Sequence, residues 1–289
     1  MTQWTRHLPR PVRRALFARH VSAAENVYHC CVHKTASQWL RKIFHDPRTF
    51  RYCGLDVFNY EQELPGGADT RRITERTFDG AFPRGTIVTP IYIDLPGFER
   101  LPKPDRFRAF FVPRDPRDVV VSWYFSVKVS HRAMGLIGEV REKLQTLPEE
   151  DGLQYVTGFV DSRGGFAALR SWQQGVAQDS RLRIFRYEDL TGENQFATWK
   201  QLLAHSDIQM PDDVLRDVLR DYAFSTLTKG RERGAEDVKS HLRKGVLGDW
   251  KNHFTPAVEE KFRAVTGHWS RNWVTPGRLF GLPSSTAAS

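Results

Sequence analysis

The stretch NVYHCCVHKTASQWLRKIF, residues 26–44, decides the fold class of this chain. Its first part is a run of small and β-branched apolar residues, which is typical of a strand. Its last part, SQWLRKIF, carries apolar residues at helical spacing. Between them stands HKTAS, residues 33–37, with one lysine and two hydroxyl side chains. We interpret the stretch as a strand, a tight turn and a helix.

The same alternation continues along the chain. Apolar runs typical of strands recur at GTIVTPIYI, FRAFFV and LRIFRY, and several are apolar nearly throughout, as in a parallel sheet covered on both faces. Helical patterns include FAALRSWQQGV, ATWKQLLAHS and DDVLRDVLRDY, and Thr255-Pro256 is typical of a helix start. The sequence predicts one α/β domain with a central parallel sheet flanked by helices, doubly wound, with its ligand crevice at the carboxyl ends of the strands.

Length and composition fit a globular protein of 289 residues with 40% hydrophobic residues. No apolar run approaches the roughly 20 residues of a membrane span. The basic opening is interrupted by Pro9 and Pro11 and is unlike a secretion signal, so we expect a cytoplasmic protein. We divide the chain into a basic arm (1–23), one domain (24–282) and a disordered tail (283–289). The three cysteines favour reduced thiols, and their spacing predicts no metal site.

A net charge of +9 favours anionic partners. The turn at residues 33–37 suits a phosphate, because a helix N-terminus offers free N–H groups and partial positive charge. Thr35 and Ser37 would add hydroxyl donors and Lys34 a cation. The turn lacks the GxxxxGK(S/T) spacing of nucleotide triphosphate loops, so alone it is compatible with a structural turn as well.

Two further basic clusters follow. In VPRDPRDVVVSWYFS, Arg114 ends a predicted strand and Ser122 lies in the helix after it. In HLRKGVLGDWKNHFT, the cations Arg243 and Lys244 precede Gly245, after a polar, glycine-rich segment of lid-like composition. Three separated anion sites predict a ligand with phosphates at two ends.

Together the three stretches resemble the PAPS-dependent sulfotransferase family of the cytosolic type. HKTASQW resembles its 5′-phosphosulfate loop, usually PKSGTTW; RDPRDVVVS is similar to its 3′-phosphate motif; and RKGVLGDWKNHFT matches its RKGxxGDWKNxFT signature. The resemblance implies an α/β domain with a P-loop-like strand-loop-helix. It also implies transfer of the sulfuryl group of 3′-phosphoadenosine 5′-phosphosulfate (PAPS) to a hydroxyl or amine, with release of adenosine 3′,5′-bisphosphate (PAP) and no metal.

Carried over position by position, the resemblance implies three sets of binding residues. Those around the 5′-phosphate are Lys34, Thr35, Ala36, Ser37 and Gln38. Those at the 3′-phosphate are Arg114, Ser122, Arg243, Lys244 and Gly245. Those at adenine are Trp39, Tyr187 and Phe224. We count Lys34, Asp94 and Ser122 as catalytic. Lys34 would stabilise charge on the bridging oxygen, since this chemistry depends on positioning and cations.

The acceptor base departs from the family pattern. Where the family often has KTHLP, this chain has YIDLP, with Asp94 at the histidine position and Tyr92 at the lysine. An aspartate is a weak base unless burial raises its pKa, and the alternative is a carboxylate that caps local amides. His33 and His131 are the rival bases.

The acceptor is expected to be a small molecule, apolar or aromatic, bordered by residues 134–165, residues 51–67 and the lid-like segment. Phe58, Tyr60, Tyr124 and Phe125 are candidate pocket aromatics, although each is also compatible with the core. We expect no nucleic-acid partner and leave a homo-oligomer open. The alternatives are a nucleotide kinase, which would need a Walker motif, and a non-catalytic module that binds nucleic acid or PAP.

Overall fold

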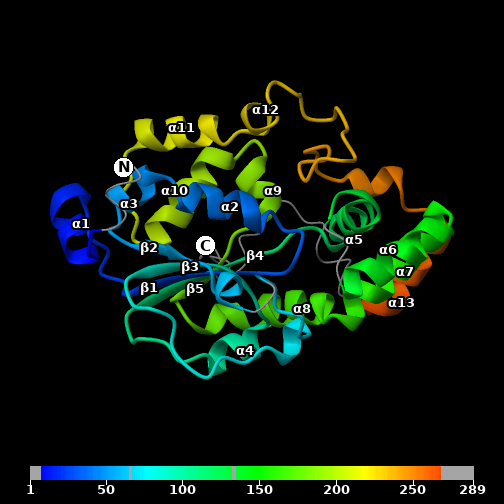
Figure 1. Cartoon of the computed structure of the whole chain (residues 1–289), viewed down its shortest axis with the longest axis horizontal. Coiled ribbons are helices and arrows are strands. Elements are labelled where there is room, and N and C mark those ends of the chain that lie inside the picture. Colours follow the sequence, from blue (N-terminus) through cyan, green and yellow to red (C-terminus); the bar gives the residue numbers. More distant parts are fainter. Residues whose placement is uncertain (1–7, 65–66, 132–134, 268–289) are drawn as a thin grey trace, which may run out of the picture.

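The computed structural model describes residues 8–64, 67–131 and 135–267, so the predicted tail at 283–289 lies outside the described residues. Five parallel strands form one sheet in the order β2-β3-β1-β4-β5 (Figure 1). Their bounds are β1 Asn26–Cys31, β2 Asp56–Phe58, β3 Thr86–Tyr92, β4 Phe107–Val112 and β5 Leu182–Ile184. The predicted α/β fold with a central parallel sheet is confirmed.

Helices cover both faces of the sheet (Figure 1). Strand β4 shows why: Phe110 and Val112 pack into one apolar cluster, and Ala109 and Phe111 pack into the other, because successive side chains point to opposite faces. The first cluster is covered by α2 Ser37–Phe44, α10 Gln195–His205 and α11 Asp212–Asp221, and the short α3 Pro47–Arg51 follows α2. The second is covered by α4 Leu95–Arg100, α5 Pro116–Phe125, α7 Glu149–Ser162, α8 Gly165–Gly175 and α13 Pro256–Thr266.

Shorter or more peripheral helices complete the fold. They are α1 Arg10–Phe17, α6 Leu136–Thr146, α9 Tyr187–Thr191 and α12 Phe224–Leu227. Helix α1 lies in the predicted basic arm and is fastened to the body by Arg13, whose guanidinium lies 2.6 Å from the Asp56 carboxylate, and by Arg14, which donates to the Gly54 carbonyl. In the described part of the chain, no helix is long and apolar enough to cross a membrane.

The strand register determines where the site forms. Cys31, the last residue of β1, pairs with Tyr92 at the end of β3 and with Val112 at the end of β4. The three central strands therefore end side by side. The segments that follow them carry Lys34, Asp94 and Arg114, so all three leave the same edge of the sheet.

Candidate active site

The turn after β1 has an unusual backbone. Lys34 and Ala36 have φ angles of 69° and 63°, in the left-handed region that non-glycine residues rarely occupy. Ala36 is the N-cap of α2, and the Thr35 hydroxyl donates to the Val32 carbonyl at 2.8 Å, which closes the turn. The Thr35 proton is thus used within the turn, while the first N–H groups of α2 lie at a helix N-terminus suited to an anion.

Lys34 is held beside α5. Its Nζ donates to the Ser126 hydroxyl at 2.8 Å and lies 5.8 Å from the centre of the Trp123 ring. Burial lowers the pKa of Lys34 to about 8, and the positive charge of Arg114 adds to the effect. Sequence analysis missed Ser126, because only tertiary structure brings it to the turn.

Tyr92 supports the turn from the end of β3. Its hydroxyl shares a hydrogen bond of 2.9 Å with the Ser37 hydroxyl, and its ring stacks on His33 at a centroid distance of 4.0 Å. The buried Arg76 lies 5.6 Å from the Tyr92 ring centre and donates to the Tyr60 hydroxyl at 2.7 Å. Tyr92 therefore orders both ends of the 33–37 turn, a role that the sequence comparison did not assign to it.

Arg114, from the second motif (RDPRDVVVS), contacts the 33–37 turn of the first. Its Nη1 lies 3.4 Å from the Lys34 carbonyl oxygen, and its guanidinium lies 4.8 Å from the centre of the Tyr187 ring. Its buried Nε has no hydrogen-bond partner among the residues that the structure describes. Ser122, half-buried, lies on α5, the helix that begins just after Arg114.

Asp118 joins the second motif to the third. Its carboxylate accepts the backbone N–H groups of Gly248 at 2.8 Å and Trp250 at 3.0 Å, and it faces Arg114 at 3.8 Å. Burial raises the pKa of Asp118, while Arg114 and the two N–H groups oppose that shift. In the sequence, the one signal for the contact between the second and third motifs is an aspartate within a largely apolar helical run. Our site prediction did not use it.

The two cations of the third motif share a carboxylate. Lys244 Nζ lies 2.7 Å from Asp249, and Arg243 pairs with both Asp249 and Glu236. Although burial opposes it, hydrogen bonds from Lys244, Asn252 and Arg243 hold the pKa of Asp249 well below its usual range. The cations are thus oriented by an acidic partner.

Gly245 lies against the predicted adenine site. A Cβ at this position would lie 2.5 Å from the Phe224 ring, and the φ angle of +69° also favours glycine. Two residues before Phe224, the Tyr222 carbonyl accepts a hydrogen bond of 2.8 Å from the Trp39 indole. The fold therefore brings the predicted adenine residues Trp39 and Phe224 onto neighbouring segments.

Asp94, unlike Lys34 and Arg114, caps a helix. It is the N-cap of α4, and its Oδ1 accepts the Gly97 N–H at 2.9 Å, as the capping alternative predicts. Burial raises the pKa of Asp94, against the Gly97 hydrogen bond. Its role as a base stays a prediction. Of the two rival histidines, His33 lies next to Lys34 and lines a pocket.

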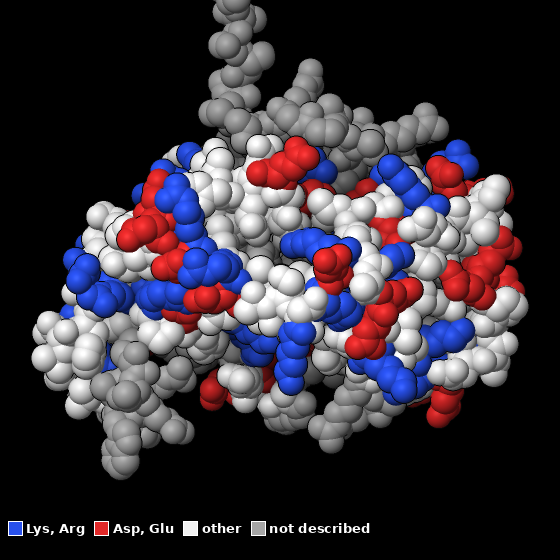
Figure 2. All heavy atoms as spheres, turned by 90° about the horizontal axis from the view of Figure 1, so that it is seen from above, with Lys and Arg blue, Asp and Glu red and all other residues white. Residues whose placement is uncertain are grey.

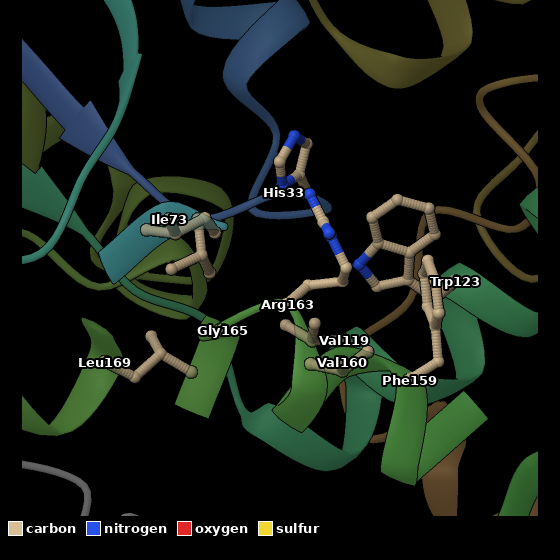
Figure 3. Close-up of a pocket in the computed structure, with 10 residues that line it drawn as sticks. His33, Ile73, Val119, Trp123, Phe159, Val160, Arg163, Gly165 and Leu169 are labelled. Carbon is tan, nitrogen blue, oxygen red and sulfur yellow. The ribbon is translucent and has the colours of Figure 1, made fainter. Parts of the chain in front are cut away.

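An apolar pocket opens beside the turn (Figure 3). Its lining includes His33, Trp123, Phe159, Arg163 and Leu169. Phe159, Val160, Arg163 and Gly165, all within the segment 134–165, are among its lining residues. Of the candidate aromatics, Tyr60 and Tyr124 are buried in the core, and Phe58 and Phe125 pack against it, in line with the core alternative. The period of a helix or strand identifies an apolar side chain, but not which cavity it lines.

Charges of both signs are interspersed on the face seen in Figure 2, where Lys and Arg lie next to Asp and Glu. Among the ion pairs of the described residues, Arg48 contacts both Asp46 and Asp221. Such a surface differs from the continuous basic stripe typical of nucleic-acid binding. Within residues 8–64, 67–131 and 135–267, no cluster of three or more His, Cys, Asp or Glu side chains is arranged to hold a metal ion.

Known proteins resemble this chain in sequence and fold. The family model described as "Sulfotransferase domain" matches residues 101–274, which include the second and third motifs. Mouse sulfotransferase 1 family member D1 is 28% identical over 166 residues, covering 54% of this chain and 52% of the relative. Bovine sulfotransferase 1E1 is 27% identical over 169 residues, with the same coverage of both chains. The chain spans about half the length of these curated relatives.

A solved structure extends the likeness in fold beyond the matched domain. The crystal structure of mouse sulfotransferase SULT7A1 complexed with PAP superposes with a TM-score of 0.51 at 15% identity. The superposition covers 87% of this chain and 86% of the mouse chain. With more than half of its length matched by the family model, the chain belongs to the sulfotransferase domain family.

Proposed function

We propose that this chain is a sulfotransferase that moves the sulfuryl group of PAPS to a hydroxyl or amine of a small acceptor and releases PAP. The observation that carries the proposal is the meeting of the first two motifs. Arg114 from the end of β4 reaches the carbonyl of Lys34 after β1, although 80 positions separate them in the chain. One strand end thus offers a cation for a transferring group, and the next offers a forked donor for a terminal phosphate.

Two features fit a bound nucleotide with a 3′-phosphate. The buried Nε of Arg114 has no partner in the described part of the chain, which is costly for a charged group and favours an anion beside it. The Arg231 and Arg233 guanidinium groups lie 5.0 Å and 5.9 Å from the centre of the Phe224 ring, so cations gather at this predicted adenine residue, against which the Gly245 backbone packs. Arg114 contacts the first motif through the Lys34 carbonyl and is connected to the third through Asp118, which accepts the Gly248 N–H.

PAPS would supply an activated sulfuryl group, and the residues of this chain would position it and neutralise charge. Lys34, held by Ser126, would lie at the oxygen that bridges sulfur and the 5′-phosphate, where negative charge builds up. The N–H groups at the start of α2 would hold the 5′-phosphate. Asp94 would take the acceptor proton, and its burial supports that assignment because it makes the carboxylate more basic.

The Arg114→Ala variant tests the cofactor site. We expect PAP affinity to fall by about 30-fold, because hydrogen bonds to charged groups contribute about 1.5–3 kcal/mol. Isothermal titration calorimetry with PAP, ADP and ATP measures this. Arg108→Ala, which removes an exposed arginine of β4, is the matched control and should bind PAP as the parent does.

The same titration separates the alternatives. A nucleotide kinase would bind ATP at least as tightly as PAP, and a nucleic-acid module would show no preference for a 3′-phosphate and a steep dependence on salt. Equal affinity of the parent for PAP and ADP would contradict the proposed cofactor. A non-catalytic PAP-binding module would pass the titration and transfer no label from PAPS to alcohols, phenols or amines.

The pKa of Lys34 predicts a pH dependence. Lys34 carries its charge below a pKa of about 8 and loses it above, so kcat/KM should fall as pH rises past that value. The corresponding fall in kcat, the basic limb of its pH profile, should lie at higher pH, since the bound anions favour the charged amine. Rates with labelled PAPS between pH 6 and 10 measure both. Lys34→Arg should remove the limb, because a guanidinium stays charged throughout this range; an unchanged limb in that variant would assign it to another group.

A further inference from the structure

A single carboxylate on α5 holds the backbone of the third motif. Asp118 lies in the first turn of α5 and is fully buried. Its Oδ2 accepts the Gly248 N–H at 2.8 Å, and its Oδ1 accepts the Trp250 N–H at 3.0 Å. These hydrogen bonds join residues that lie 130 and 132 positions apart in the chain. Asp118 therefore fixes two backbone groups of a distant segment.

The two N–H groups flank a second carboxylate, that of Asp249. Asp249 lies 2.7 Å from Lys244 Nζ and also pairs with Arg243. Because Asp249 stands between the two residues whose N–H groups Asp118 accepts, a shift of that backbone would move the carboxylate that orients both cations. The position of both cations thus depends on Asp118.

Asp118 also faces the cation of the second motif. Its Oδ2, the oxygen that accepts from Gly248, lies 3.8 Å from Arg114 Nη2. The guanidinium of the preceding residue, Arg117, lies 3.6 Å from the centre of the Trp250 ring. Two consecutive side chains of α5 therefore hold the segment at 248–250, and one of them contacts Arg114.

An acidic side chain is at first sight a poor neighbour for an anion site. By its charge alone, Asp118 would repel a phosphate bound beside Arg114. A buried carboxylate is also costly unless hydrogen bonds and a cation compensate for the lost water. Here two backbone N–H groups and Arg114 supply that compensation. Its contacts thus assign this carboxylate to the protein backbone, and its value to the site lies in what it holds in place.

Resting on the proposed function, we infer that Asp118 is a positioning residue for the 3′-phosphate of PAPS and PAP. It holds the third motif on α5, so that Arg243 and Lys244 keep a fixed position relative to Arg114 before the nucleotide arrives. Such preorganisation lowers the entropic cost of binding. The gain falls on the 3′-phosphate, to which the proposed function assigns these three cations. A nucleotide without that phosphate gains nothing from it.

The ligands PAP and adenosine 5′-monophosphate (AMP), which differ only in the 3′-phosphate, test the inference by calorimetry. In Asp118→Asn, the amide offers one acceptor oxygen and turns its NH2 group toward the second backbone N–H, so the segment loses a contact. We expect PAP affinity to fall about tenfold and AMP affinity to change by less than about threefold. Charge alone predicts the opposite, because removing a negative charge near the phosphate would strengthen PAP binding.

Asp207→Asn is the control for an aspartate that fastens a distant segment. Its carboxylate accepts the Ser22 hydroxyl and the Ala23 N–H, and it lies outside the three motifs. This variant should lower the melting temperature yet keep the parental ratio of PAP affinity to AMP affinity. A ratio that fell equally in Asp207→Asn would reduce the effect of Asp118→Asn to lost stability and would overturn the inference.

Hydrogen exchange, measured by mass spectrometry on peptides that span 246–252, follows the hold itself. The Gly248 and Trp250 amides should be protected in the ligand-free parent and exchange faster in Asp118→Asn. Rapid exchange in the parent, or an unchanged or stronger preference for PAP in the variant, would overturn the inference. The measurement on the parent decides if Asp118→Asn does not fold. A parent that binds PAP no more tightly than AMP contradicts the proposed function instead, and amide exchange then still tests the hold by Asp118.

Discussion

Replacing Lys34 with methionine is expected to lower the rate of sulfuryl transfer about 1,000-fold while PAP affinity changes by less than about tenfold. Removing one donor aimed at developing charge typically costs 100- to 1,000-fold in rate. We expect the upper end, because Lys34 is a full charge, partly buried and already oriented by Ser126 at 2.8 Å. Single-turnover transfer from labelled PAPS measures the rate, and calorimetry with PAP measures the affinity.

Lys128→Met is the control for the loss of one lysine charge. Its Nζ bonds to the Tyr124 hydroxyl at 2.8 Å, close in the chain to Ser126, and it belongs to none of the three motifs. This variant should turn over as the parent does. A Lys34→Met protein that retained more than a tenth of the parental rate would exclude Lys34 from the transfer step.

Asp94→Asn is expected to reduce turnover about 100-fold with no loss of fold. Asparagine caps a helix about as well as aspartate, so its Oδ1 can still accept the Gly97 N–H that Asp94 accepts at 2.9 Å. What the variant removes is the proton acceptor, and general base catalysis typically contributes 100-fold or more. Rates at saturating PAPS and thermal unfolding of the same samples measure the two effects separately.

Two further variants separate the role of Asp94 as a base from its role as a helix cap. Asp94→Ala removes the cap as well, so it should destabilise the protein by about 1 kcal/mol relative to Asp94→Asn. His33→Gln removes the rival base next to Lys34. Near-parental turnover in Asp94→Asn together with a large loss in His33→Gln would reassign the base to His33 and leave Asp94 as a helix cap alone.

The architecture was largely predictable because strands that are buried on both faces of a sheet are apolar nearly throughout, which is visible in the sequence. The runs at β1, β3 and β4 predicted the central strands, and Thr255-Pro256 predicted the start of α13, where the Thr255 hydroxyl accepts the Val258 N–H. Strand β2, Asp56–Phe58, escaped notice since three residues carry no period. The strand predicted at LRIFRY is confirmed for Leu182–Ile184 only, because α9 begins at Tyr187.

The site was predictable only where function imposes a motif. Arg114 lies beside Lys34 as two strand ends at one sheet edge require. The contacts of Lys34 with Ser126 and of Ser37 with Tyr92 depend on how α5 and β3 pack. The spacing of residues along the chain does not predict that packing. For the same reason, the sequence left the candidate aromatics open between the acceptor pocket and the core. Trp123 and its neighbour Tyr124 read alike in sequence, yet one lines the pocket and the other lies in the core.

The pairing of Arg243 and Lys244 with Asp249 has a consequence for how a ligand leaves. Cations that stand alone in an empty site would repel one another and make departure of a polyanion costly. If PAP binds to Arg243 and Lys244 as we propose, the carboxylate of Asp249 would balance their charge once the ligand has left. The ligand-free and PAP-bound states would then be closer in free energy, which would favour product release over tight retention of PAP.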